Sequence, residues 1–142
     1  MPVLTEEART ALTAGHLAHL TTLGPDGAPH VTIVWVGLDG DEIVSAHLGR
    51  YQKIRNVERD PRVVISMLTG GRNPMGLDFH LVVYGRARVT EGGAPELLQR
   101  LARTYLGPDV VFPPMPDPPP GFILRTAPRR LGGIGPWAPP RG

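Results

Sequence analysis

The sequence has 142 residues, a length that one domain with a single hydrophobic core usually occupies. It contains no cysteine, which excludes disulfides, thiolate zinc sites and cysteine nucleophiles and favours a cytoplasmic location. The formal net charge of +2 is small for a general nucleic-acid surface, and the longest apolar run, residues 31–38, is too short to span a bilayer.

The first third of the chain predicts one short helix and then three strands. Thr5, followed by two glutamates, has the pattern of an N-cap, and Gly15 can end the helix that it starts. Strands are expected at residues 16–22, 29–37 and 42–48. Turn sequences at residues 24–27 and 38–41 join them, so this region predicts an antiparallel meander.

The middle of the chain predicts a helix at residues 51–59, ended by Asp60-Pro61, and a strand at residues 62–68. A loop is expected at residues 69–74, and strict alternation then predicts the longest strand, residues 77–90. The apolar face of this strand comprises Leu77, Phe79, Leu81, Val83, Ala87 and Val89. Its polar face, with Asp78, His80, Tyr84, Arg86 and Arg88, is interpreted as the solvated side of a sheet, with a cofactor groove as the alternative.

The last third predicts a helix at residues 94–105, a proline-rich loop at residues 107–121 and a strand at residues 122–126. A Pro/Gly-rich tail is expected over about residues 131–142. Short strands with tight turns and few helices indicate a mainly β protein. The sequence therefore predicts a closed or partly split antiparallel barrel that forms one domain over residues 1–142.

Cations cluster where the third predicted strand meets the second helix. The single lysine of the chain, Lys53, lies here with four of the fourteen arginines: Arg50, Arg55, Arg59 and Arg62. A helix N-terminus offers unpaired N–H groups and partial positive charge, so this junction favours an anion such as phosphate. The spacing of three between Arg50 and Lys53 predicts that both lie on one side of the helix. A solvated basic helix is the alternative.

Two stretches of the chain resemble a known family. The stretch KIRNVERDPRV at residues 53–63, preceded by HLGR at residues 47–50, resembles the pyridoxamine 5'-phosphate oxidase-like split-barrel superfamily. It resembles more narrowly the small actinobacterial reductases that depend on the deazaflavin coenzyme F420. The stretch LTTLGPDGAPHV at residues 20–31 is similar to the first hairpin of the family, and the order of elements matches over about residues 5–130.

This resemblance implies a six-stranded antiparallel split barrel of the FMN-binding type. It also implies a homodimer with two cofactor sites at the interface between the subunits. Lys53 would bind the cofactor phosphate, helped by Arg50 and the backbone near Ala46 and His47, while His30 and Thr32 would flank the ring system. Several relatives carry arginine where this chain has Tyr51, so Arg50 is expected to replace that ligand. The expected cofactor-binding residues are Lys53, Arg50, His30, Thr32, Ala46, His47, Tyr51 and Asn56.

Two tryptophans are candidates for the substrate pocket. Trp35 either lines the pocket or packs in the core or an interface, because a large aromatic on a strand often fills space. In the resembling reductases the carboxyl-terminal segment borders the pocket, so Trp137 is expected near the ring, with a disordered tail as the alternative. The five histidines show no metal-ligand spacing, so no metal is expected.

Three functions follow from these observations. The first is an F420-dependent oxidoreductase that passes a hydride from the reduced deazaflavin to a small electron-poor organic substrate. The second keeps the barrel and binds FMN, as an oxidase or flavin reductase. The third is a protein without catalysis that carries a cofactor, or that binds RNA through its arginines. We expect a small-molecule substrate, with no nucleic-acid or membrane partner.

Overall fold

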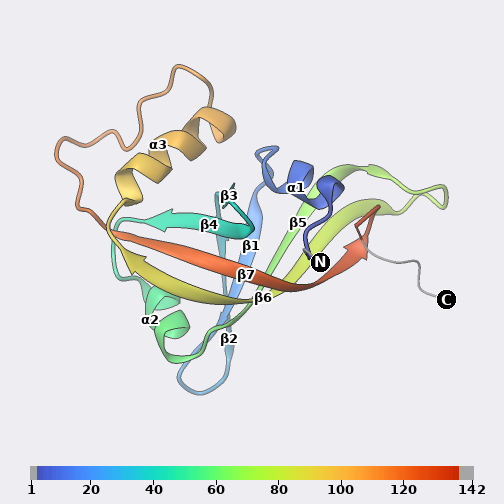
Figure 1. Cartoon of the computed structure of the whole chain (residues 1–142), viewed down its shortest axis with the longest axis horizontal. Helices are drawn as coiled ribbons and strands as arrows, with labels where there is room; N and C mark the ends of the chain where they lie inside the picture. The colour runs from blue at the N-terminus through green and yellow to red at the C-terminus, as the bar shows by residue number, and fades with distance from the viewer. Residues whose placement is uncertain (1–2, 138–142) are drawn as a thin grey trace.

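A computed structural model of the protein describes residues 3–137, and its main feature is one seven-stranded, fully antiparallel sheet. The strand order within this described part is β2-β1-β5-β6-β7-β4-β3, and three helices accompany the sheet (Figure 1). The elements in chain order are α1 (Glu6–Leu12), β1 (Ala18–Leu23), β2 (Pro29–Val34), β3 (Gly37–Asp39), β4 (Glu42–His47), α2 (Gln52–Arg59), β5 (Arg62–Arg72), β6 (Asp78–Glu91), α3 (Ala94–Tyr105) and β7 (Phe122–Ile134).

The predicted mainly β split barrel is confirmed, but the strand count and the meander are not. The expected strand 29–37 is two strands, because the chain leaves β2 after Val34 and begins β3 at Gly37. Between them the N–H of Val36 donates to the hydroxyl of Tyr105 on α3, at 3.1 Å, instead of continuing the β2 pairing. Strand β1 pairs with β5 and β4 pairs with β7, so β2 lies at one edge of the sheet, while β3 and β4 lie at the other.

Two strands are longer than the sequence indicated. Strand β5 extends to Arg72 rather than ending at Leu68, because Gly70 and Gly71 adopt positive φ and carry the pairing with β6 through an irregularity. Strand β7 runs to Ile134, well past the predicted end at residue 126, because it pairs along nearly the whole of β6. The expected tail therefore begins inside a strand, and residues 138–142 lie outside the described part.

The core forms between the inner face of the sheet and the helices α1 and α2. Leu20, Ile65 and Leu81 are at most 3% exposed, as are the inward side chains of α2, Ile54 and Val57. The predicted apolar side of this helix is thus confirmed. The inward face of β6 is also as predicted except at its start, where Leu77 precedes the strand and is exposed. Helix α3 has the predicted bounds.

Candidate functional site

The N-terminus of α2 has unpaired backbone donors and no acidic residue in its first turn. Tyr51 is the N-cap residue, in an extended conformation, and makes no side-chain capping bond. The first backbone bonds of the helix run from Ile54 and Arg55 to the carbonyl of Tyr51, at 3.0 and 3.2 Å. The N–H groups of Gln52 and Lys53 therefore precede the helical ladder, and the first turn contains no carboxylate that could accept from them. This end of α2 is suited to an anion.

Lys53 adds a positive charge to the same turn. Within residues 3–137 no carboxylate lies within ion-pair distance of its ammonium group, and Nζ lies 5.9 Å from the centre of the Tyr51 ring. The side chain is half-buried, and this burial lowers the pKa of Lys53 from its ordinary value. A half-buried ammonium without a counter-ion is destabilised relative to water, and a bound anion would restore the lost interaction.

His47, at the end of β4, is the buried neighbour of Lys53. Its Nε2 lies 2.8 Å from the hydroxyl of Ser45, and the side chain is 6% exposed. Burial, together with the positive charge of Lys53, lowers the pKa of His47 to about 3, so the imidazole is neutral at pH 7. Ala46, also buried, precedes His47 on β4 and pairs with Ile123 of β7. The structure therefore brings Lys53 close to His47 and the end of β4, the region that the family resemblance implied; a role of these residues in binding a cofactor stays a prediction.

Arg50 has partners other than those expected. Its NH1 donates to both carboxylate oxygens of Glu58, at 2.6 and 2.7 Å, and its NH2 lies 3.8 Å from Glu91. The guanidinium also lies 5.0 Å from the centre of the Phe122 ring. The predicted placement of Arg50 and Lys53 on one side of a helix is wrong, because α2 begins only at Gln52. Arg50 would have to leave Glu58 to reach an anion beside Lys53.

His30 and Thr32 lie on β2, directly opposite Thr22 and Leu20 of β1. Two of their polar atoms, His30 Nδ1 and Thr32 Oγ1, are buried and have no hydrogen-bond partner among the described residues. Buried polar atoms in proteins are nearly always paired, so two such atoms on one strand face indicate a missing partner. This observation fits a bound polar molecule that both residues contact.

Asn56 is fully buried and serves the fold. Its Nδ2 donates to the hydroxyl of Thr22 at 3.0 Å, and its Oδ1 accepts from Gln52 Nε2 at 2.6 Å. Both ends of the amide are therefore occupied: the bond to Thr22 holds α2 against β1, and the bond from Gln52 lies within α2. The structure gives Asn56 a positioning role, and its expected contact with a cofactor stays a prediction.

Both tryptophans are used in packing. Trp35 stacks on Tyr105, with 5.4 Å between ring centroids and 15° between planes, and its centroid lies 5.2 Å from that of Phe112. Trp137 is 8% exposed, belongs to the main core cluster, and donates from Nε1 to the carbonyl of His80 at 3.1 Å. The contacts of Trp35 are thus those expected of a residue that fills space. Trp137 is ordered and packs in the core, so it is not part of a disordered tail.

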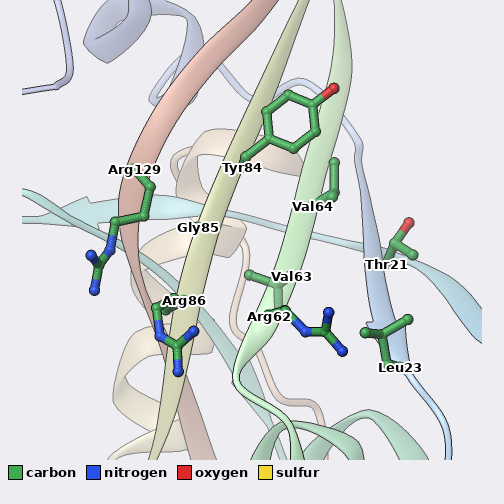
Figure 2. A pocket seen from close by; sticks show the side chains of 9 residues that line it. All are labelled: Thr21, Leu23, Arg62, Val63, Val64, Tyr84, Gly85, Arg86 and Arg129. Carbon is green, nitrogen blue, oxygen red and sulfur yellow. The ribbon is translucent and has the colours of Figure 1, made fainter. Parts of the chain in front are cut away.

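A cavity of about 410 Å³ lies on the outer face of the sheet, where the sequence analysis favoured a solvated surface and gave a cofactor groove as the alternative. Its arginines, Arg62, Arg86 and Arg129, come from the neighbouring strands β5, β6 and β7 (Figure 2). Alternation along residues 77–90 does place Tyr84 and Arg86 on that face. No sequence signal indicated Arg129, which belongs to a part of β7 that was predicted to lie beyond the strand.

Comparison with known proteins identifies the family. Residues 4–134 match the family described as pyridoxamine 5'-phosphate oxidase. The chain belongs to this family. A solved F420 reductase is 25% identical, with a TM-score of 0.70 over 91% of this chain and 98% of that chain. The conserved hypothetical protein Rv2991 from Mycobacterium tuberculosis is also 25% identical, with a TM-score of 0.68 over 92% of this chain and 84% of that one.

More distant similarity concerns the fold alone. A haem-binding protein from Mycobacterium smegmatis is 22% identical, with a TM-score of 0.64 over 92% of this chain and 53% of that chain. No curated protein matches the chain. Together the comparisons place the protein in a fold family of flavin- and deazaflavin-binding oxidoreductases.

Between residues 3 and 137 no helix has both the length and the apolar character needed to cross a bilayer. In the same part of the chain no three histidine or carboxylate side chains converge as metal ligands.

Proposed function

We propose that the protein is an F420-dependent oxidoreductase of the cytoplasm, which transfers a hydride from the reduced deazaflavin to a small electron-poor organic substrate. The observation that carries this proposal is Lys53, a half-buried ammonium without a carboxylate partner among residues 3–137, at the open N-terminus of α2. The solved F420 reductase that covers nearly the whole chain at 25% identity supports the choice of cofactor.

The phosphate of the cofactor fits the Lys53 turn. Lys53 Nζ and the N–H groups of Gln52 and Lys53 are the donors that this turn offers. A hydrogen bond to a charged group contributes about 1.5–3 kcal/mol net, so three of them contribute roughly 4.5–9 kcal/mol; micromolar affinity, about 8 kcal/mol, therefore requires all three donors near the top of this range. The neutral imidazole of His47 adds no second positive charge, which leaves Lys53 as the dominant cation.

The ring system fits the inner side of β2. His30 Nδ1 and Thr32 Oγ1 need hydrogen-bond partners, and the polar edge of a flavin or deazaflavin ring offers donors and acceptors. The cofactor supplies the hydride chemistry when it is bound. The residues of this chain anchor the phosphate, orient the ring through β2 and exclude water from its inner face.

FMN is the alternative cofactor, because the Lys53 turn would meet a phosphate in either case. An FMN oxidase or flavin reductase is therefore the second candidate, and the family match supports it equally. The acidic tail of F420 favours the deazaflavin, since arginines dominate the basic residues of this chain. A carrier without catalysis would bind one of these cofactors and reduce no substrate.

Titration of the protein with F420 and with FMN, followed by tryptophan quenching, tests the proposal. We expect F420 to bind more tightly and Lys53→Ala to weaken it about tenfold or more, the equivalent of one charge-assisted bond. Arg103→Ala is the matched control, because it removes an exposed cation from α3 without touching α2. Tight FMN binding without a response to F420 would refute the deazaflavin assignment. Unchanged affinity in Lys53→Ala would refute the phosphate site.

Turnover separates an enzyme from a carrier. Oxidation of reduced F420 should be followed by its absorbance in the presence of quinone and enone acceptors, and we expect acceptor-dependent oxidation that Lys53→Ala slows. Binding without such oxidation, over a panel of both acceptor classes, would support the carrier instead.

We also propose that the protein acts as a homodimer with cofactor sites at the interface. Val31 and Ile33 on the outer side of β2 are 56% and 59% exposed, a surface that a second subunit would cover. Light scattering after size exclusion should give the mass of a dimer, and Ile33→Glu should give a monomer. A monomeric mass for the unaltered protein would refute this arrangement.

A further inference from the structure

We infer that Glu58 and Glu91 hold Arg50 away from the cofactor phosphate. The N-terminal turn of α2 then accepts a singly charged phosphodiester in preference to a doubly charged phosphomonoester. F420 carries its phosphate as a diester, whereas FMN carries a monoester, so the two glutamates are specificity-determining residues for the deazaflavin. The inference rests on the proposed function, because it concerns the phosphate that binds at this turn.

Side chains from three elements contact Arg50. Its NH1 donates to both carboxylate oxygens of Glu58, in the last turn of α2, at 2.6 and 2.7 Å, and its NH2 lies 3.8 Å from Glu91 at the end of β6. Its guanidinium lies 5.0 Å from the centre of the Phe122 ring at the start of β7. Arg55 donates to the carbonyl of Arg50 at 2.9 Å, which holds the backbone of the same residue. Both terminal nitrogens of the guanidinium therefore already have a carboxylate partner.

The charges left at the turn match one negative charge better than two. Lys53 supplies one full positive charge, and the helix end supplies a partial one. The imidazole of His47 is neutral, because burial and the charge of Lys53 lower its pKa to about 3. Arg50, with two carboxylates beside it, adds no net positive charge. A phosphomonoester carries about −1.5 to −2 at pH 7, so a diester with its single charge is the better match for Lys53 alone.

The other two arginines of α2 do not replace Arg50. Arg55 lies two positions from Lys53, so the two side chains leave the helix on different sides. The terminal nitrogens of Arg55 donate to the carbonyl of Arg50 and to Oε1 of Gln52, at 2.9 and 3.2 Å. Arg59 lies in the last turn of the helix and donates to a carbonyl of β1. Of these cations of the described chain, Lys53 alone has neither a carboxylate nor a carbonyl partner.

Transfer of Arg50 to a phosphate would leave two carboxylates beside the bound anion. A second negative charge on that anion makes the repulsion larger, so the monoester is affected more than the diester. The side chains of Arg50 and Glu58 are 46% and 37% exposed, and solvent therefore weakens their pairing. We expect a moderate discrimination, of about fivefold, that the carboxylate of Glu58 controls.

Calorimetric titration of the whole protein at pH 7 with FMN and with the 5'-methyl ester of FMN tests the inference. The two ligands share the ring and the ribityl chain and differ in the charge of the phosphate. We expect the unaltered protein to bind the methyl ester more tightly than FMN. Glu58→Gln should tighten FMN by about fivefold and change the methyl ester and F420 by less than about twofold. Glu91→Gln should act in the same direction with a smaller gain, because Glu91 is farther from Arg50.

Control variants show whether the gain depends on Arg50. Arg50→Ala added to Glu58→Gln should cancel the gain in FMN affinity. Glu7→Gln removes an exposed carboxylate from α1 and should leave both affinities unchanged. Glu58→Gln keeps the shape of a partly exposed side chain, and circular dichroism checks that the fold is retained. An equal gain for both ligands, or a gain that persists without Arg50, would overturn the inference, as would a Glu58→Gln variant without any gain for FMN.

Lys53→Ala separates this inference from the proposed function. It should weaken FMN, the methyl ester and F420 together, because it removes the cation that all three phosphates contact. If it does so and Glu58→Gln leaves the preference for the diester unchanged, the inference is overturned while the phosphate site stands. If Lys53→Ala changes none of the three affinities, the phosphate site is refuted and the inference with it.

Discussion

Replacing His47 by glutamine should reduce the sensitivity of the fold to acid. The imidazole is 6% exposed and its only polar partner in the described part of the chain is the hydroxyl of Ser45. Burial, with the charge of Lys53 nearby, lowers the pKa of His47 from 6.5 to about 3. Glutamine keeps a hydrogen-bonding group at the position but cannot take up a proton in this pH range.

The direction of the effect follows from proton binding in the two states. Between pH 6.5 and about 3 the unfolded chain binds a proton at His47 that the folded chain does not. The free energy of unfolding contributed by this group is therefore complete above pH 6.5 and falls as the pH decreases through that window. Between pH 7 and pH 4 the loss amounts to roughly 3 kcal/mol.

Urea unfolding at pH 7, 5.5 and 4 measures this difference. We expect His47→Gln to lose about 3 kcal/mol less than the unaltered protein between pH 7 and pH 4, because the remaining titrating groups are common to both. His19→Gln, in which an exposed imidazole is removed, is the matched control and should follow the unaltered protein. Parallel loss of stability in His47→Gln and the unaltered protein would show that the folded imidazole titrates normally, and would refute the reasoning.

Three further substitutions test contacts that hold the site in place, each by urea unfolding at pH 7. Asn56→Ala should cost about 2–4 kcal/mol, because it leaves the fully buried hydroxyl of Thr22 without its donor and opens a cavity under α2; a cost below 1 kcal/mol would contradict this role. Gly85→Ala should cost about 1–3 kcal/mol because its Cβ would press on β7, and wild-type stability would mean that the strands separate easily. Thr5→Ala should cost about 0.5–2 kcal/mol through loss of the N-cap bond to the N–H of Ala8 at 3.1 Å, whereas Thr13→Ala at the other end of α1 should cost less.

Sequence patterns correctly predicted the helices and strands whose capping residues or alternating apolar residues lie within one short segment. The bounds of α3, the N-cap Thr5 and the alternation of Leu81, Val83 and Ala87 on β6 all depend on residues within one segment. Sequence reasoning could not place β2 and β4 at opposite ends of the sheet, because that order depends on long-range strand pairs, β1 with β5 and β4 with β7. The bond between the hydroxyl of Tyr105 and the N–H of Val36, where the chain passes from β2 to β3, is also long-range, sixty-nine positions apart.

The candidate site likewise has one feature that the sequence indicated and others that depend on contacts between distant residues. The placement of Lys53 near His47 was implied by the family resemblance of residues 47–63, which join the end of a strand to the start of a helix. The partner of Arg50 did not follow, because Glu58 lies eight positions away, in the last turn of α2, and its contact with Arg50 exists only in the folded chain. The amide of Asn56, likewise, is occupied by Thr22 of β1, thirty-four positions away.

Ion pairing explains why net charge is a weak guide to the partners of this protein. Most arginines of the described residues are bound to carboxylates or carbonyls, as in the pairs Arg9–Asp41, Arg50–Glu58, Arg72–Asp78, Arg88–Glu42 and Arg125–Asp39. The cations left without such partners are few. Among the described residues they are Lys53 at one helix end, Arg86 and Arg129 at one cavity, Arg103 on α3, and Arg130, which lies over the Tyr84 ring. Because an anion gains most where a cation has no partner to give up, anionic ligands should bind beside these few cations rather than over the basic surface as a whole.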